Sequence, residues 1–140
     1  FLRDDPKCAM NHFGDLTAVD WPENDGDRFE LVLYMRSVEH AHRIFVRTTV
    51  AEGKDAPTLS KVWAGANWAE REVYDMFGIR FDDHPDLRRI LMYEEFEGYP
   101  LRKDFPLLAR HVKPWPGIVA PIVFIRHQID IPELLQLIAD

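Results

Sequence analysis

Two neighbouring segments with alternating apolar residues most constrain the fold of this chain. Apolar and more polar residues alternate over 29–36 and again over 43–50, a period of two that is typical of half-buried strands. The segment 37–40 between them is short enough to form a hairpin connection. A third short strand is predicted over 16–21, where Pro22 and a polar turn end it. Three consecutive strands favour an antiparallel or mixed sheet with helices on one face, which is an α+β fold.

One helix is predicted after these strands. Asn67 is a favourable N-cap, and Glu70 follows three residues later, as in a capping box. Gly78 is well placed to end the helix. An apolar stripe at helical spacing indicates the buried face: Ala69, Val73, Met76 and Phe77. The opposite face carries Glu70, Arg71, Glu72 and Asp75. We expect these charges to form a structural ion-pair network with nearby arginines.

The chain changes character after this helix. Residues 81–116 follow neither a helical nor a strand period, and they interleave prolines, aromatic residues and bases. Long non-periodic segments inside a small domain are uncommon, and the aromatic content disfavours disorder. We therefore predict an α+β core over 1–80, an extended proline-rich docking arm over 81–116, and a variable tail over 117–140.

Composition excludes several classes of function. The 140 residues carry 24 acidic side chains against 17 lysines and arginines, a net charge of −7, which argues against a nucleic-acid partner. Cys8 is the single cysteine, so no internal disulfide can form. The longest apolar run, 117–125, is too short to cross a bilayer. The sequence has no signal-peptide pattern and does not begin with Met, so we expect a trimmed N-terminus.

Residues that could carry chemistry are few. The cluster Asp82-Asp83-His84 lacks the spacing of a metal site, and solvated loop charges explain it better. No glycine-rich phosphate-binding motif occurs. Glu72 and Asp75 could in principle act with His84 as a stand-alone acid–base enzyme, but a helix face followed by a loop does not predict their convergence. The sequence therefore predicts no catalytic, cofactor-binding or metal-binding residue in this chain.

Residues 66–107 resemble the 30 kDa-type (C-type) subunit of the proton-pumping NADH:quinone oxidoreductase, respiratory complex I. The first part of the family signature is matched by Glu70, Arg71, Glu72, Asp75, His84 and Arg88. A later part is matched by Gly98, Pro100, Arg102, Lys103, Asp104 and Phe105. The similarity extends over roughly residues 1–110. In the family a helix and a strand precede the position of Phe1, so we expect an incomplete sheet edge.

The resemblance implies a cofactor-free structural subunit of the hydrophilic arm, whose complex carries FMN and iron–sulfur clusters on other subunits. Its implied partners are the large quinone-site subunit (D-type) and the terminal-cluster subunits (B-type and I-type). Membrane association would be indirect, on the cytoplasmic side of the inner membrane or on the matrix side in an organelle. The expected docking residues are Arg88, Arg89, Tyr99, Arg102, Lys103, Asp104, Phe105 and Trp115.

The same signature leaves related complexes open. The alternative is the equivalent subunit of a membrane-bound hydrogenase, an F420H2 dehydrogenase or a ferredoxin-dependent photosynthetic dehydrogenase. Co-purifying subunits with or without a flavin and an NADH site would distinguish these possibilities.

Overall fold

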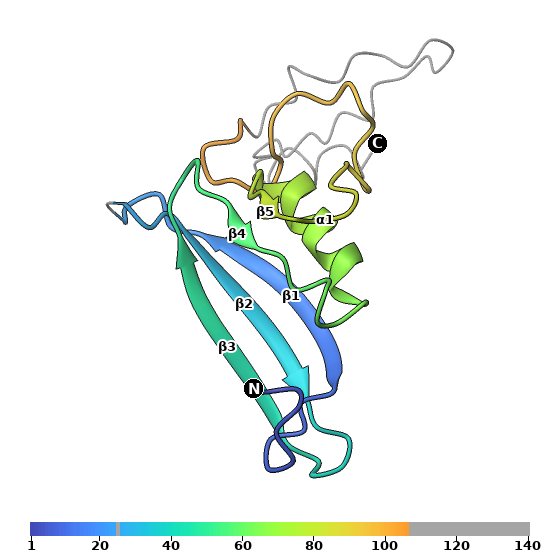
Figure 1. Ribbon diagram of the computed structural model, residues 1–140. Coiled ribbons are helices and arrows are strands. Elements are labelled where there is room, and N and C mark those ends of the chain that lie inside the picture. Colours follow the sequence, from blue (N-terminus) through green and yellow to red (C-terminus); the bar gives the residue numbers. More distant parts are fainter. Residues whose placement is uncertain (25, 107–140) are drawn as a thin grey trace, which may run out of the picture. The chain divides into compact units, whose positions relative to one another are not determined.

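The computed structural model describes residues 1–24 and 26–106. Three long strands, β1 (His12–Asp20), β2 (Phe29–Arg36) and β3 (Arg43–Val50), form an antiparallel sheet in the order β1-β2-β3 (Figure 1). The predicted hairpin of β2 and β3 is confirmed, and β1 begins four residues earlier than predicted. The expected arm beyond residue 106 and the tail 117–140 lie outside the described residues.

Two further elements complete the described part of the chain. The helix α1 (Ala66–Phe77) follows the sheet, and the two-residue strands β4 (Ala56–Pro57) and β5 (Phe81–Asp82) pair in parallel on either side of it in sequence. A small antiparallel sheet with a helix is the predicted α+β class. Residues 1–106 form one compact unit.

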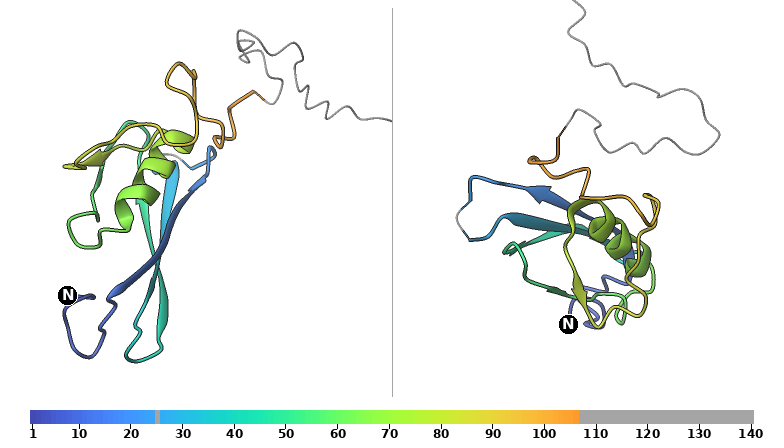
Figure 2. Two further views of the ribbon diagram at one scale, coloured as in Figure 1. Left: turned by 90° about the vertical axis from the view of Figure 1, so that its right-hand side faces the viewer. Right: turned by 90° about the horizontal axis from the view of Figure 1, so that it is seen from above.

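The apolar core lies between α1 and one face of the sheet, which we call the inner face. The inner-face side chains of β2 are buried, whereas their alternating neighbours are only half-buried or exposed. Val73, Met76 and Phe77 of α1 belong to the same buried cluster as Leu16 and Leu31 of the sheet. Figure 2 shows the helix lying over this side of the strands.

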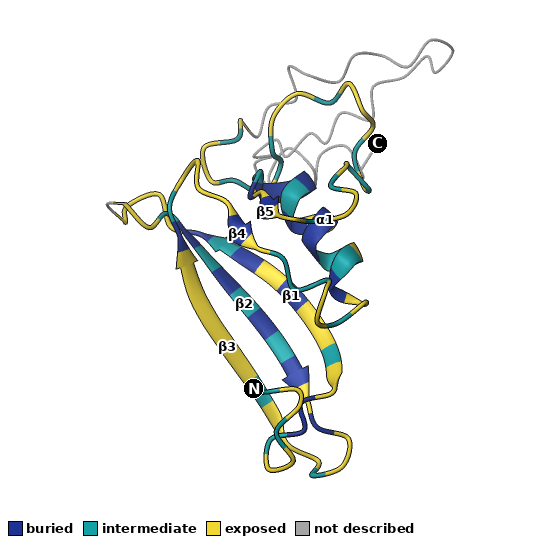
Figure 3. Ribbon diagram, in the orientation of Figure 1, coloured by how far each residue is buried: buried dark blue, intermediate teal, exposed yellow. Residues whose placement is uncertain are grey.

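The strand β3 is exposed along most of its length (Figure 3). A groove of about 410 Å³ follows its inner-face side, with a mainly apolar lining that includes Leu33, Val46 and Phe81. Val46 is therefore 37% exposed although it faces the core side of the sheet. Val50, at the end of β3, is buried.

The predicted N-cap of the helix is wrong. The helix begins at Ala66 after Gly65, and no side chain caps it. Glu70 does not return to its own helix end, because its carboxylate accepts hydrogen bonds from the Thr58 hydroxyl (2.6 Å) and the Leu59 N–H (2.5 Å). A tertiary partner has replaced the local capping arrangement. The predicted end at Gly78 is confirmed, with a left-handed φ of 76°.

Replacing Gly78 by alanine tests how tightly the segment after the helix packs on this helix end. A Cβ at Gly78 would lie 2.5 Å from the Tyr99 ring, whereas one at Gly53, with the same φ of 76°, would meet nothing within 4 Å. We expect Gly53→Ala to cost about 1–2 kcal/mol from the left-handed backbone alone. Gly78→Ala should cost about 1–3 kcal/mol more because of the added overlap. Urea unfolding of both variants measures the difference, and equal costs would contradict the packing.

Candidate functional site

The segment 83–106, which we call the strap, is held on α1 by a buried carboxylate. The Asp75 side chain has no solvent exposure. Its Oδ2 accepts hydrogen bonds from the N–H groups of Ile90 (3.0 Å), Leu91 (2.7 Å) and Met92 (2.8 Å). Its Oδ1 pairs with the Arg89 guanidinium at 2.6 Å. One helix residue thus binds four consecutive residues of the strap.

The same contacts control the ionisation of Asp75. Burial by itself would raise the pKa of this carboxyl group. The N–H donors of Met92 and Leu91, followed by Arg89 and the N–H of Ile90, outweigh burial and hold the pKa below its ordinary value of 3.8. Asp75 is therefore an anion at neutral pH and acts as a hydrogen-bond acceptor.

Arg71 binds the strap one turn earlier on the helix. Its Nε donates to the carbonyl oxygen of Arg88 at 3.2 Å and its Nη2 to that of Arg89 at 3.3 Å. Its guanidinium also lies 5.1 Å from the centroid of the Trp68 ring. The expected ion-pair network on this helix face is therefore only partly correct, since Asp75 does pair with Arg89 but Arg71 binds backbone carbonyls instead of acids.

His84 and Glu70 form a second buried contact at the start of the strap. Both side chains are fully buried, with His84 Nε2 3.8 Å from Glu70 Oε2. His84 Nδ1 accepts a hydrogen bond from the Asp86 N–H (3.0 Å), so the ring proton lies on Nε2 and points to the carbonyl oxygen of Asn67 (3.2 Å). The imidazole fixes the turn by which the chain enters the strap.

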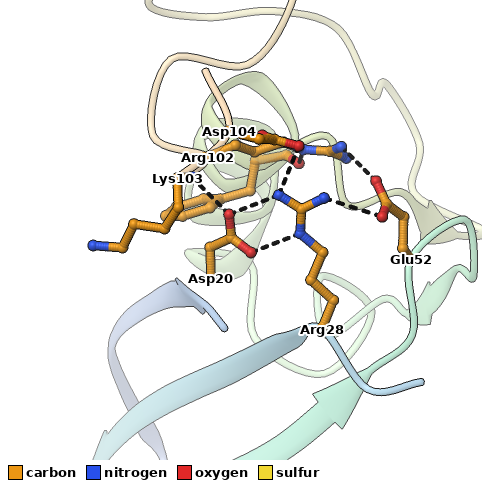
Figure 4. Close-up of polar contacts among 7 residues, drawn as sticks. Asp20, Arg28, Glu52, Arg102, Lys103 and Asp104 are labelled. Carbon is orange, nitrogen blue, oxygen red and sulfur yellow. Dashed lines mark hydrogen bonds and ion pairs between the residues drawn. The ribbon is translucent and has the colours of Figure 1, made fainter. Parts of the chain in front are cut away.

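A charged cluster fastens the far end of the strap to the sheet (Figure 4). Asp20, at the end of β1, has a fully buried side chain and binds Arg28 through two contacts of 2.7 and 2.9 Å. Its Oδ2 also accepts the N–H of Lys103 at 2.7 Å. Arg28 continues to Glu52 (3.0 Å) and to Asp104 of the strap (2.9 Å).

No sequence pattern predicts this cluster. Asp20 and Arg28 are separated from Lys103 by more than seventy residues, and no local spacing connects them. Arg28 lowers the pKa of the Asp20 carboxyl group, and the Lys103 N–H adds to this effect against the opposing effect of burial. The carboxylate in turn raises the pKa of Arg28. The pair is fully ionised at neutral pH.

Arg102 joins this cluster to the helix end. Its Nε donates to the carbonyl oxygen of Phe77 at 2.6 Å, and its Nη1 pairs with Glu52 at 2.8 Å. The guanidinium lies close to two aromatic rings, 5.0 Å from the centroid of Phe29 and 4.7 Å from that of Tyr99. Cation–π contacts of this kind are strengthened where solvent is excluded.

The predicted docking residues thus fall into two groups. Arg89, Tyr99, Arg102 and Phe105 are engaged with their own chain, Phe105 through the Phe96 ring at 5.9 Å. The side chains of Arg88 and Asp104 are 69% and 58% exposed, and Lys103 is exposed. Trp115 lies outside the described residues.

The structure gives the acid–base alternative no support. Glu72 is exposed, Asp75 is saturated by strap donors, and His84 is bound to backbone groups. No hydrogen bond or ion pair joins any two of these three side chains within 1–24 and 26–106, and none of them lines the groove beside β3. In the same part of the chain, no three acidic, histidine or cysteine side chains are grouped to hold a metal ion.

The two depressed aspartate pKa values predict a dependence of stability on acid. The unfolded chain binds protons at these groups near 3.8 and the folded chain only below that value. The stabilisation is therefore complete above 3.8 and is lost as the pH falls from there through the folded pKa values. Denaturant unfolding of the wild type and of Asp20→Asn between about pH 6 and about pH 3 should give a flatter profile for the variant. Parallel profiles would contradict this assignment.

Comparison with known proteins identifies the family. The family model described as respiratory-chain NADH dehydrogenase, 30 Kd subunit, matches residues 1–111. The chain belongs to this family. The matched region includes the whole strap and both carboxylate contacts described above. The 30 kDa subunit family is thus shown over the part of the chain in which the signature residues hold the strap.

Several curated relatives agree with this assignment. The C-type subunit of the NADH-quinone oxidoreductase of Hyphomonas neptunium is 50% identical over 111 residues, which are 79% of this chain and 54% of the relative. The C-type subunit of Rhodobacter capsulatus is 53% identical over 106 residues, covering 76% of this chain and 53% of the relative. The chain spans about half the length of these relatives. In the described part of this 30 kDa family member, no helix has the length and hydropathy needed to span a bilayer.

Proposed function

We propose that this chain is a structural, cofactor-free subunit of the peripheral arm of a proton-translocating NADH:quinone oxidoreductase. The observation that carries the proposal is the use of the family signature. Glu70, Arg71 and Asp75 each direct their polar groups to the backbone or side chains of neighbouring segments. Side chains occupied in this way can shape a docking surface, but they are not available to a substrate.

The proposed role is to present the strap to neighbouring subunits as a preformed surface. The strap is fixed at Asp75 and again at Asp20, so little of its backbone must be ordered when a partner binds. The exposed charges of Arg88, Lys103 and Asp104 would then contact the partner. The partners proposed from the family resemblance are the large quinone-site subunit (D-type) and the terminal-cluster subunits (B-type and I-type).

The complex as a whole would transfer electrons from NADH to quinone and couple this to proton translocation. FMN and iron–sulfur clusters would lie on the other subunits. The subunit would be attached to the membrane only through these partners, on the cytoplasmic side of a bacterial inner membrane or on the matrix side in an organelle. Relatives that are named as C-type subunits of NADH-quinone oxidoreductase support NADH as the donor.

Purification of the tagged protein from its native membranes tests this proposal. We expect flavin-bearing and iron–sulfur subunits to co-purify in constant ratio, with NADH oxidation by an added quinone in the same fraction. Recovery of a nickel-containing subunit without a flavin and an NADH site would assign the chain to a hydrogenase instead. Recovery of the tagged protein alone, without any oxidoreductase subunit, would contradict the structural role.

A further inference from the structure

The outer face of the sheet, opposite α1, carries a group of arginines around an exposed aromatic side chain. Arg36 and Arg43 lie directly opposite each other on β2 and β3, and Tyr34 and Phe45 form the next pair on the same face. Arg47 follows two residues further along β3. We call these five residues the arginine–phenylalanine face.

The pairing of Arg36 with Arg43 is unfavourable within the chain. Like charges directly opposite on neighbouring strands destabilise a sheet. Neither guanidinium has a hydrogen bond, an ion pair or a ring contact within the described residues. His12 of β1 stands opposite Arg36 in the same row, so this row holds two guanidinium groups and one imidazole across three strands. The fold alone does not explain this concentration of cations in a chain with a net charge of −7.

The aromatic part of the face is ordered and exposed. Phe45 is 68% exposed, and its ring stacks on Tyr34 with the centroids 5.0 Å apart. Tyr34 in turn lies over Gly14 of β1, where a Cβ would overlap the tyrosine ring. This glycine leaves room for the tyrosine and thereby supports the stack. An ordered aromatic side chain bordered by arginines has the composition of an interface hot spot.

We propose that the arginine–phenylalanine face binds a partner protein through an apolar pocket that is bordered by carboxylates. Phe45 fills the pocket, and Arg36 and Arg43 each pair with an acidic side chain of the partner. This surface is separate from the strap, and the inference rests on the proposed function, since it requires a multisubunit assembly. Carboxylates brought between the two arginines also relieve their mutual repulsion, so the free chain is less stable at this point than the bound one.

Other occupants fit the same observations less well. A second copy of the chain would bring a further set of arginines to the face and increase the repulsion. An anionic lipid surface would also meet Asp15 and Glu30, which lie on this outer face opposite Tyr34 and Thr49. A protein surface can place its carboxylates opposite the arginines alone. The arrangement therefore favours a protein partner.

A photoreactive group at position 45 tests the inference. The probe is p-benzoylphenylalanine in place of Phe45 in the full subunit, irradiated within the complex purified from native membranes. We expect a cross-link to one partner subunit, at a segment that carries Asp or Glu on both sides of an apolar position. Arg43→Glu should lower the yield by about tenfold or more, and an acid-to-lysine change in that partner segment should restore it. The matched control is Arg80→Glu, whose side chain is 72% exposed and lies outside this face; it should leave the yield unchanged.

Stability separates loss of docking from loss of folding. Because Arg43→Glu replaces a repulsive pair by an attractive one, the variant should unfold at the same temperature as the wild type or at a higher one. A cross-link to lipid, to a second copy or to no subunit would overturn the inference, as would equal yields for Arg43→Glu and Arg80→Glu. If the complex co-purifies normally in these cases, only this inference fails. If the wild-type protein recovers no oxidoreductase subunit, the proposed function fails with it.

Discussion

Replacing Asp75 by alanine should destabilise the chain by about 3–5 kcal/mol, the cost of removing one partner from a buried ion pair. The change would leave the Arg89 guanidinium without its carboxylate and three strap N–H groups without their acceptor. Unsatisfied buried donors cost more than an exposed contact contributes. Denaturant unfolding of the purified chain measures the loss of stability.

The control for this prediction lies on the same helix. Glu72 is exposed, so Glu72→Ala should change the unfolding free energy by no more than about 0.5 kcal/mol. Amide hydrogen exchange adds a local measurement, since Asp75→Ala should remove the protection of the N–H groups of residues 90–92. A cost below about 1 kcal/mol, or retained protection at these amides, would show that Asp75 does not hold the strap.

Replacing Asp20 by alanine should have the second largest effect, again about 3–5 kcal/mol. Its side chain is fully buried and its partner Arg28 is 12% exposed, so the guanidinium would lose its main anion in a place where water reaches it poorly. The Lys103 N–H would also lose its acceptor. Urea unfolding measures the cost, and exchange of the Lys103 amide reports the release of the strap.

A matched control exists inside the same cluster. Glu52 pairs with both Arg28 and Arg102, but its side chain is 51% exposed. Exposed ion pairs contribute little, so Glu52→Ala should cost about 1 kcal/mol or less. Equal costs for Asp20→Ala and Glu52→Ala would contradict the distinction between the buried and the exposed part of the cluster.

The sequence predicts those parts of the fold that depend on neighbouring residues. Strand alternation over 29–36 and 43–50 and the stop at Gly78 are local patterns, and the structure confirms them. The predicted N-cap is wrong because Glu70 binds Thr58 and Leu59, a tertiary choice that capping statistics do not contain. The burial of Asp75 is hidden for the same reason, since helix periodicity cannot reveal that a later segment will cover the charged face.

The candidate site is predictable only in part. The signature residues are identified by resemblance, yet their contacts become visible only once the strap is placed on α1. Asp20 and Arg28 give no local signal at all, because their common partners Lys103 and Asp104 lie far away in sequence. Interleaved arginine and aromatic residues indicate docking, whereas the structure uses Arg89 and Arg102 first within the chain itself.

The central claim is that the signature carboxylates act through assembly and take no part in the redox chemistry. The measurement that tests it most directly uses a host whose only copy of the protein carries Asp75→Asn. The assembled complex is quantified in the membranes, and NADH:quinone turnover is expressed per assembled complex. The account predicts less assembled complex with unchanged turnover in each complex. Normal assembly with strongly reduced turnover would contradict it.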